Sequence, residues 1–185
     1  MKKRLIILLS TLLLLTPSFG KDGLSFQLSE QQLEEKITPY FPFRRSALMG
    51  QIKFELSQPD LILKAGSQRA ELQLKSKITS GGSQFPGNLK LSFGVDYTPK
   101  TGTFYLIEPR VENFQVSGVS TAVTSTVTSY LMPILQKQLM RVPVYTLKAP
   151  QSNGQNIARH TLKKISIADK SLNVSLGWVD SKTNK

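Results

Sequence analysis

Residues that could carry out chemistry are few in this sequence and stand far apart. The chain of 185 residues has no cysteine and one histidine, His160, so a structural zinc site is not expected. His160 lies in the basic segment ARHTLKK, where no neighbouring carboxylate would orient it, and we expect a surface histidine. Glu34 and Glu35 form the only adjacent acidic pair, which is most simply solvated on a polar helix face.

Catalysis is therefore the minority interpretation of this chain. No serine lies in a nucleophile-elbow pattern. Carboxylates that are distant in sequence could still converge in space, as glycosidases require, and the sequence leaves that alternative open. We expect no enzyme, no metal and no cofactor.

The first twenty residues have the layout of a secretory signal peptide. A basic start (MKKR) precedes an apolar run from Leu5 to Leu15, and small residues occupy the −3 and −1 positions before Lys21, at Ser18 and Gly20. Such a run is too short to cross a membrane, because about 30 Å of hydrocarbon requires about 20 residues. We expect cleavage between Gly20 and Lys21 and export to the periplasm. Without any cysteine, the exported protein would be soluble, with no acyl anchor and no disulfide.

A strongly basic charge balance accompanies this layout. The formal net charge is +12, and removal of Lys2, Lys3 and Arg4 with the leader leaves +9. Such a balance favours contact with anionic surfaces, so an anionic membrane surface or an envelope protein is a candidate partner. The basic residues are scattered and no basic helix carries interleaved aromatics, so nucleic acid is not expected. One domain is predicted over residues 21–180, with a disordered tail at 181–185.

Alternation of apolar and polar residues dominates the middle of the chain and its C-terminal end. This pattern predicts half-buried antiparallel strands near residues 51–56, 61–63, 72–75, 89–97, 103–107 and 111–116, and a hairpin over 165–178. The segment SGGSQFPGN is expected to be a turn-rich connection. A capping box from Ser29 to Gln32 predicts a short helix that ends near Thr38, before Pro39. Another short helix is expected around Asn156 to Lys164.

Residues 119–140 are predicted to form a long helix of two different halves. Valines and leucines recur every four residues, at Val119, Val123, Val127, Leu131, Leu135 and Leu139. The second half adds Tyr130, Met132, Ile134 and Met140 on further faces, so we expect that half to be enclosed. The Ser/Thr half can face water, and Pro133 should bend the helix. The expected fold class is α+β: a strongly bent antiparallel β-sheet wrapped around one long C-terminal-half helix, with short N-terminal and C-terminal helices.

Four segments of the C-terminal half match a known family in order and spacing. They are GTFYLIEPRVENFQVSGV from Gly102, LMPILQKQLM, VPVYTLKAP and KKISIADKSLNVSLGW. In these the chain, from about Leu24 to Trp178, resembles the YceB-like family of small bacterial envelope proteins, usually lipoproteins, whose domain has no established function. The resemblance implies a fold similar to a single module of the tubular lipid-binding superfamily. This chain departs from the family because it lacks the lipidated cysteine, which favours a soluble periplasmic form.

Two functions from different classes follow from this interpretation. The first is a periplasmic binding protein for a lipid or other apolar small molecule, held in a cleft between the sheet and the long helix. The expected ligand-binding residues are Tyr130, Leu131, Ile134, Leu135 and Leu139 on the helix and Phe54, Leu74, Leu91 and Phe93 on the strands. The alternative is an envelope scaffold or interaction protein, in which the same residues form a fully packed core.

Overall fold

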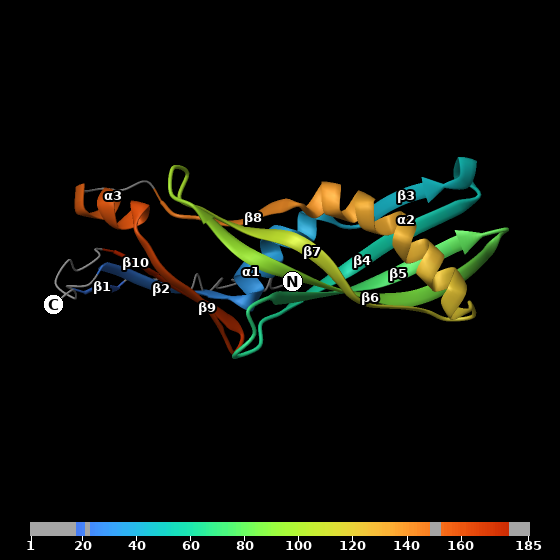
Figure 1. The fold of residues 1–185 in the computed structure, drawn as a ribbon, viewed down its shortest axis with the longest axis horizontal. Coiled ribbons are helices and arrows are strands. Elements are labelled where there is room, and N and C mark those ends of the chain that lie inside the picture. The colour runs from blue at the N-terminus through green and yellow to red at the C-terminus, as the bar shows by residue number, and fades with distance from the viewer. Residues whose placement is uncertain (1–17, 21–22, 149–152, 178–185) are drawn as a thin grey trace, which may run out of the picture.

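Two antiparallel sheets divide the chain, and helices pack against the inner face of the larger sheet (Figure 1). This computed structural model describes residues 18–20, 23–148 and 153–177. Most of the expected signal peptide, Lys21 of the expected cleavage site and the expected tail at 181–185 lie outside the described residues. Gly20, the other residue of that cleavage site, ends a short strand.

The described elements follow one another with these bounds. The first half contains β1 (Ser18–Gly20), β2 (Gly23–Ser29), α1 (Glu30–Ile37), β3 (Phe43–Ala47), β4 (Ile52–Ile62), β5 (Ala70–Ser80) and β6 (Ser83–Thr98). The second half contains β7 (Thr103–Val116), α2 (Thr121–Leu139), β8 (Arg141–Thr146), α3 (Asn153–His160), β9 (Leu162–Ala168) and β10 (Ser171–Leu176). Short 3-10 turns lie at Thr38–Tyr40 and Leu48–Gly50.

The larger sheet is a curled antiparallel meander in the order β3-β4-β5-β6-β7-β8. Its tightest connection is the turn between β5 and β6, where Ser80 lies directly opposite Ser83. Gly81 and Gly82 both have positive φ, of 55° and 81°, as the two central residues of the hairpin turn that matches strand twist require. The prediction that SGGSQFPGN is a turn-rich connection is therefore wrong beyond Gly82, because residues 83–88 are already part of β6.

Helix α1 closes the curl of this sheet. It begins at the predicted capping box, in which Ser29 Oγ accepts the amide of Gln32 and the Gln32 side chain accepts the amide of Ser29. Its buried residues Leu33 and Ile37 belong to the main core, and the helix contacts both β4 and β8. The predicted N-terminal helix is thus confirmed, including its end before Thr38.

The smaller sheet has the order β1-β2-β10-β9 and lies at one end of the elongated molecule, beside α3 (Figure 1). The predicted hairpin near the C-terminus forms β9 and β10. The second predicted short helix is α3, but it ends at His160, and residues 162–164, which were expected to be helical, belong to β9. Phe26 of β2 joins the two sheets, because its ring packs edge-on against Phe104 at 5.9 Å and lies 5.9 Å from Tyr145. The single sheet that the sequence predicted is therefore two sheets with a shared core.

Helix α2 differs from the long, enclosed helix that was expected. It has 19 residues, which gives about 28 Å at 1.5 Å per residue, whereas the 16 residues of β6 extend for about 54 Å. The helix is buried along one stripe formed by Val127, Leu131, Leu135 and Leu139. Tyr130 is 44% exposed, so the sheet covers one side of this helix and does not wrap around it.

Candidate functional site, a groove beside helix α2

An open groove of about 480 Å³ lies between α2 and the second half of β7. Strand β8 pairs with β7 only from Thr103 to Ile107, so beyond Ile107 the helix, and no strand of the described chain, lies along this edge. The groove is lined from β7 by residues 111–116 and from the helix side by Val119, Thr121, Thr124, Ser125, Thr128 and Ser129. It is therefore a sheet-and-helix groove at the place where the sheet loses its last strand.

The floor of the groove is apolar. Val111 and Phe114 of β7 stand opposite Leu91 and Leu89 of β6, whose side chains are buried. Paired residues of an antiparallel ladder share a face, so Val111 and Phe114 also point to the inner side of the sheet. Both are only partly buried, as is Val116, and all three pack against the main core. The floor thus offers accessible apolar surface that is continuous with the interior.

The helix wall is made of short side chains whose hydroxyls are already bonded. The Thr124 hydroxyl donates to the carbonyl of Ser120 at 3.2 Å, and the Thr128 hydroxyl donates to the carbonyl of Thr124 at 2.8 Å. Their donors are thereby used within the helix, a pattern common for threonine in helices. Serine and threonine are too short to fill the space above the strand, which is why the groove stays open here and closes along the leucines of the second half.

Two bulges shape β7 where it forms this floor. The register between β6 and β7 shifts at Lys90/Leu91 and again between Ser92 and Gly94, and Glu108 has a positive φ of 51°. Glu112 is the extra residue of the first shift, because Asn113 faces Lys90 and Val111 faces Leu91. Bulges bend a strand and increase its twist, so they turn the second half of β7 toward the helix.

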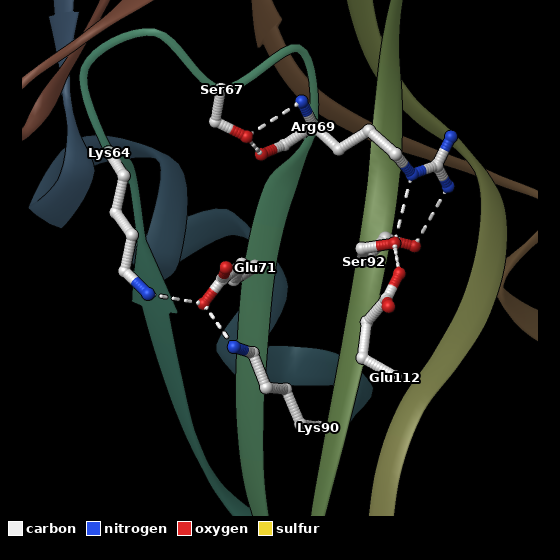
Figure 2. Close-up of polar contacts among 7 residues, drawn as sticks. All are labelled: Lys64, Ser67, Arg69, Glu71, Lys90, Ser92 and Glu112. Atoms are coloured by element: carbon white, nitrogen blue, oxygen red, sulfur yellow. Dashed lines mark hydrogen bonds and ion pairs between the residues drawn. The ribbon is translucent and has the colours of Figure 1, made fainter.

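Arg69, the residue before β5, reaches across to these bulges, and Figure 2 shows its contact with Ser92 of β6. Its Nε donates to Ser92 Oγ at 2.9 Å, and its Nη2 donates to the carbonyls of Ser92, at 3.1 Å, and Glu108. The Ser92 hydroxyl in turn donates to the carboxylate of Glu112, which lines the groove. Ser67 accepts the Arg69 amide at 3.1 Å and orients the start of β5. This network couples three strands and holds the floor in place.

A second polar cluster lies beside this network, on β5, on β6 and on the segment that follows β4 (Figure 2). Glu71 Oε2 lies 2.9 Å from Lys64 Nζ and 2.7 Å from Lys90 Nζ. The hydrogen bond from Lys90 is the main cause that holds the pKa of Glu71 below its usual range, and Lys64 acts in the same direction. The Glu71 carboxylate is therefore charged at neutral pH and pairs with two lysines on the outer face of the sheet.

The predicted site residues are brought together, but away from this groove. Leu131, Leu135 and Leu139 of α2 and Leu74, Leu91 and Phe93 of the strands are buried in one core, together with Phe54. Ile134 packs against this core and is partly buried. Tyr130 lies at the margin, with its ring 6.1 Å from that of Phe54. None of the nine lines the groove beside β7.

The sequence did not lead us to the groove, because we placed the ligand site on the most apolar part of α2, its second half. The available signal was a Ser/Thr-rich half-helix next in sequence to the alternating strand Val111 to Val116. Small side chains that face apolar ones across a helix–sheet contact leave space between them.

Residues with catalytic potential remain apart in the described chain. His160 is exposed, with its Nδ1 2.8 Å from the carbonyl of Asn156, as the surface prediction required. Glu34 is not simply solvated, because it accepts the backbone amide of Leu61 at 2.9 Å. Within the part of the chain that the structure describes, no three His, Cys, Asp or Glu residues are grouped to hold a metal ion. No helix among the described residues combines the length and apolar character that crossing a membrane requires.

The family model described as "Protein of unknown function (DUF1439)" matches residues 28–170. The chain therefore belongs to the DUF1439 family. No curated protein matches the sequence significantly. Among solved structures, the chain is similar to P47 of Clostridium botulinum E1, with 9% sequence identity and a TM-score of 0.46. That match covers 86% of this chain and 50% of the P47 chain, so this protein spans about half the length of its structural neighbour.

Proposed function

We propose that this protein binds a lipid or another elongated apolar molecule in the groove between α2 and β7. The observation that carries the proposal is the partly buried apolar floor of Val111, Phe114 and Val116 inside a volume of about 480 Å³. Ligand pockets typically measure about 300–1,000 Å³ and are mostly apolar with a few polar groups. The groove has this size, and four of its twelve lining residues are apolar, three of them on the floor.

An elongated ligand suits the groove better than a compact polar one. The groove follows β7 over six residues, 111–116, along the first half of α2. Hydroxyls that are bonded within the helix leave threonine methyl groups to contact a ligand. Each buried methylene contributes about 0.8 kcal/mol, so an acyl chain gains affinity in proportion to the length that it buries.

We further propose that the protein is a YceB-like envelope protein that is exported and acts in the periplasm without performing a chemical reaction. The basic start, the apolar run and the small residues before Lys21 support export. Cell fractionation tests this part separately: recovery in the periplasmic extract is expected, and recovery with membranes after a high-salt wash would contradict a soluble form.

Native mass spectrometry tests ligand binding directly. The protein is purified from cells without detergent, and organic extraction of the same sample identifies any molecule that it carries. A lipid-sized mass at a defined stoichiometry is the expected result. A bare mass together with no uptake of added fatty acid or phospholipid would refute lipid binding and favour the scaffold alternative.

A further inference from the structure

A basic hollow of about 310 Å³ lies on β3, β4 and β5, at the end of the sheet that carries the β3–β4 turn. Its lining includes Arg44, Lys53 and Lys77, with the hydroxyl-bearing residues Ser46 and Thr79. The strand register places Arg44, Glu55 and Lys77 in one cross-strand row and Ser46, Lys53 and Thr79 in the next. Both rows alternate with the buried Phe54, so they stand on the outer face of the sheet, opposite the core.

This end of the sheet carries positive charge in excess. Segments 43–57 and 75–88, which pair at this end of the sheet, contain five basic residues and a single acidic one, Glu55. Glu55 lies 2.9 Å from Arg44 and 3.8 Å from Lys77, and the hydrogen bond from Arg44 is the main cause that lowers its pKa. Among the described residues, no carboxylate lies within ion-pair distance of Lys53. The hollow therefore keeps a net positive charge after its own ion pairs are counted.

An exposed apolar side chain stands at the tip of the same hairpin. Met49, in the turn Leu48–Gly50 between β3 and β4, has an exposed fraction of 106% and a positive φ of 56°. Residues other than glycine rarely adopt this backbone conformation. The turn therefore holds Met49 away from the protein at a cost in conformational free energy. Methionine in water contributes nothing to folding here, whereas at a lipid interface it would be buried.

From these two observations we infer that the β3–β4 hairpin is a docking surface for an anionic lipid bilayer. Met49 enters the interfacial region, and the cations of the hollow contact the phosphate groups of the surface. The combination of an apolar tip with flanking basic residues is what interfacial binding requires, because burial of apolar area and attraction to anionic lipid act together. An acidic protein surface would satisfy the cations but would leave the fully exposed Met49 without a matching apolar site.

The geometry of the adjacent turn fits this orientation. The β5–β6 turn lies beside the hairpin, since Ile52 pairs with Ser80, and its two central residues are Gly81 and Gly82. Neither glycine has a side chain to hold the sheet away from a surface, and open space surrounds both. Docking through this end needs no ligand in the groove beside β7, so the inference stands apart from the proposed function.

Vesicle co-sedimentation of the purified protein tests the docking surface. We expect binding to phosphatidylcholine vesicles that contain phosphatidylglycerol, and little binding to pure phosphatidylcholine. Lys53→Gln with Lys77→Gln should weaken the partition about fivefold for each cation removed, and Met49→Ser about tenfold. The matched controls are Lys100→Gln with Lys137→Gln, and Met140→Ser, since both lysines and Met140 are exposed elsewhere.

A fluorescence measurement checks the orientation independently. The chain has no cysteine, so Met49→Cys provides a single attachment point for an environment-sensitive dye. A blue shift on addition of the anionic vesicles is expected at residue 49 and not for Met140→Cys. Equal binding to both vesicle types, hairpin variants that bind as tightly as their controls, or a blue shift at residue 140 alone would overturn the inference.

Discussion

Replacement of Thr128 by tryptophan should block the groove without disturbing the fold. Thr128 lines the groove, is partly buried and lies near the C-terminal end of the helix wall. Thr126 is the matched control, because it is exposed and absent from the lining. The two positions are about 200° apart around the helix. Each threonine also donates one hydrogen bond to the carbonyl four residues earlier, so both substitutions remove the same interaction.

The size of the effect follows from the surface that the indole would cover. A tryptophan side chain buries about 150–250 Å². If half of the lower figure is floor surface taken from the ligand, about 75 Å² at about 25 cal/mol per Å² amounts to about 2 kcal/mol. Such a loss weakens binding about 30-fold. Thr126→Trp covers no groove surface, and its affinity should stay within about twofold of the native protein.

The assay is titration with an environment-sensitive fatty-acid probe, with urea unfolding of each variant as the test of folding. The expected order of affinity is the native protein and Thr126→Trp together, with Thr128→Trp far weaker at unchanged stability. Equal probe affinity in the two folded variants would refute the assignment of the ligand to this groove.

Three other predictions concern the parts that support the site. Leu135→Ala should lower the free energy of unfolding by about 2–5 kcal/mol, because Leu135 is fully buried. Urea unfolding measures this loss beside that of Ile134→Ala, a change at a partly buried neighbour. An equal loss of stability in both variants would contradict the prediction. Arg69→Met should leave the bulge carbonyls without their donor and cost about 1–3 kcal/mol, together with weaker probe binding; native affinity would show that the network does not hold the floor. Glu71 has a folded pKa below its unfolded value, so its contribution to stability is present above the unfolded pKa and disappears as pH falls through the folded one. Urea unfolding between about pH 5 and pH 3 should therefore show a shallower loss of stability for Glu71→Gln, and parallel curves would refute this role.

Local signals in the sequence predicted the elements whose causes are local. The capping box at Ser29, the alternation from Leu89 to Tyr97 and the hairpin around Asp169 each specify one element through side chains a few residues apart. The i+4 row of α2 likewise predicted a helix with a buried stripe. Strands β3 and β8 were not predicted, because they are short and polar or interrupted by proline, as in FRRSA and RVPVYT. Strand β2 was also missed, although Leu24, Phe26 and Leu28 alternate with polar residues.

Features that depend on contacts between distant segments could not be predicted from the local sequence pattern. The division into two sheets depends on β2 pairing with β10, about 150 residues later, and no local periodicity encodes that choice. The apolar surplus around Tyr130 and Met140 suggested enclosure, yet both side chains remain exposed because the sheet covers only one side of α2. The groove itself arises where β8 stops pairing at Ile107, which is a property of the sheet edge.

Photo-crosslinking with a fatty acid that carries a photoreactive group near the middle of its chain shows where the ligand lies on the protein. After irradiation and proteolysis, mass spectrometry identifies the modified residues. Binding in the groove predicts adducts confined to residues 111–116 of β7 and to the Ser/Thr half of α2. Adducts concentrated on the leucine half of α2, or scattered over the surface without competition from unlabelled fatty acid, would contradict it.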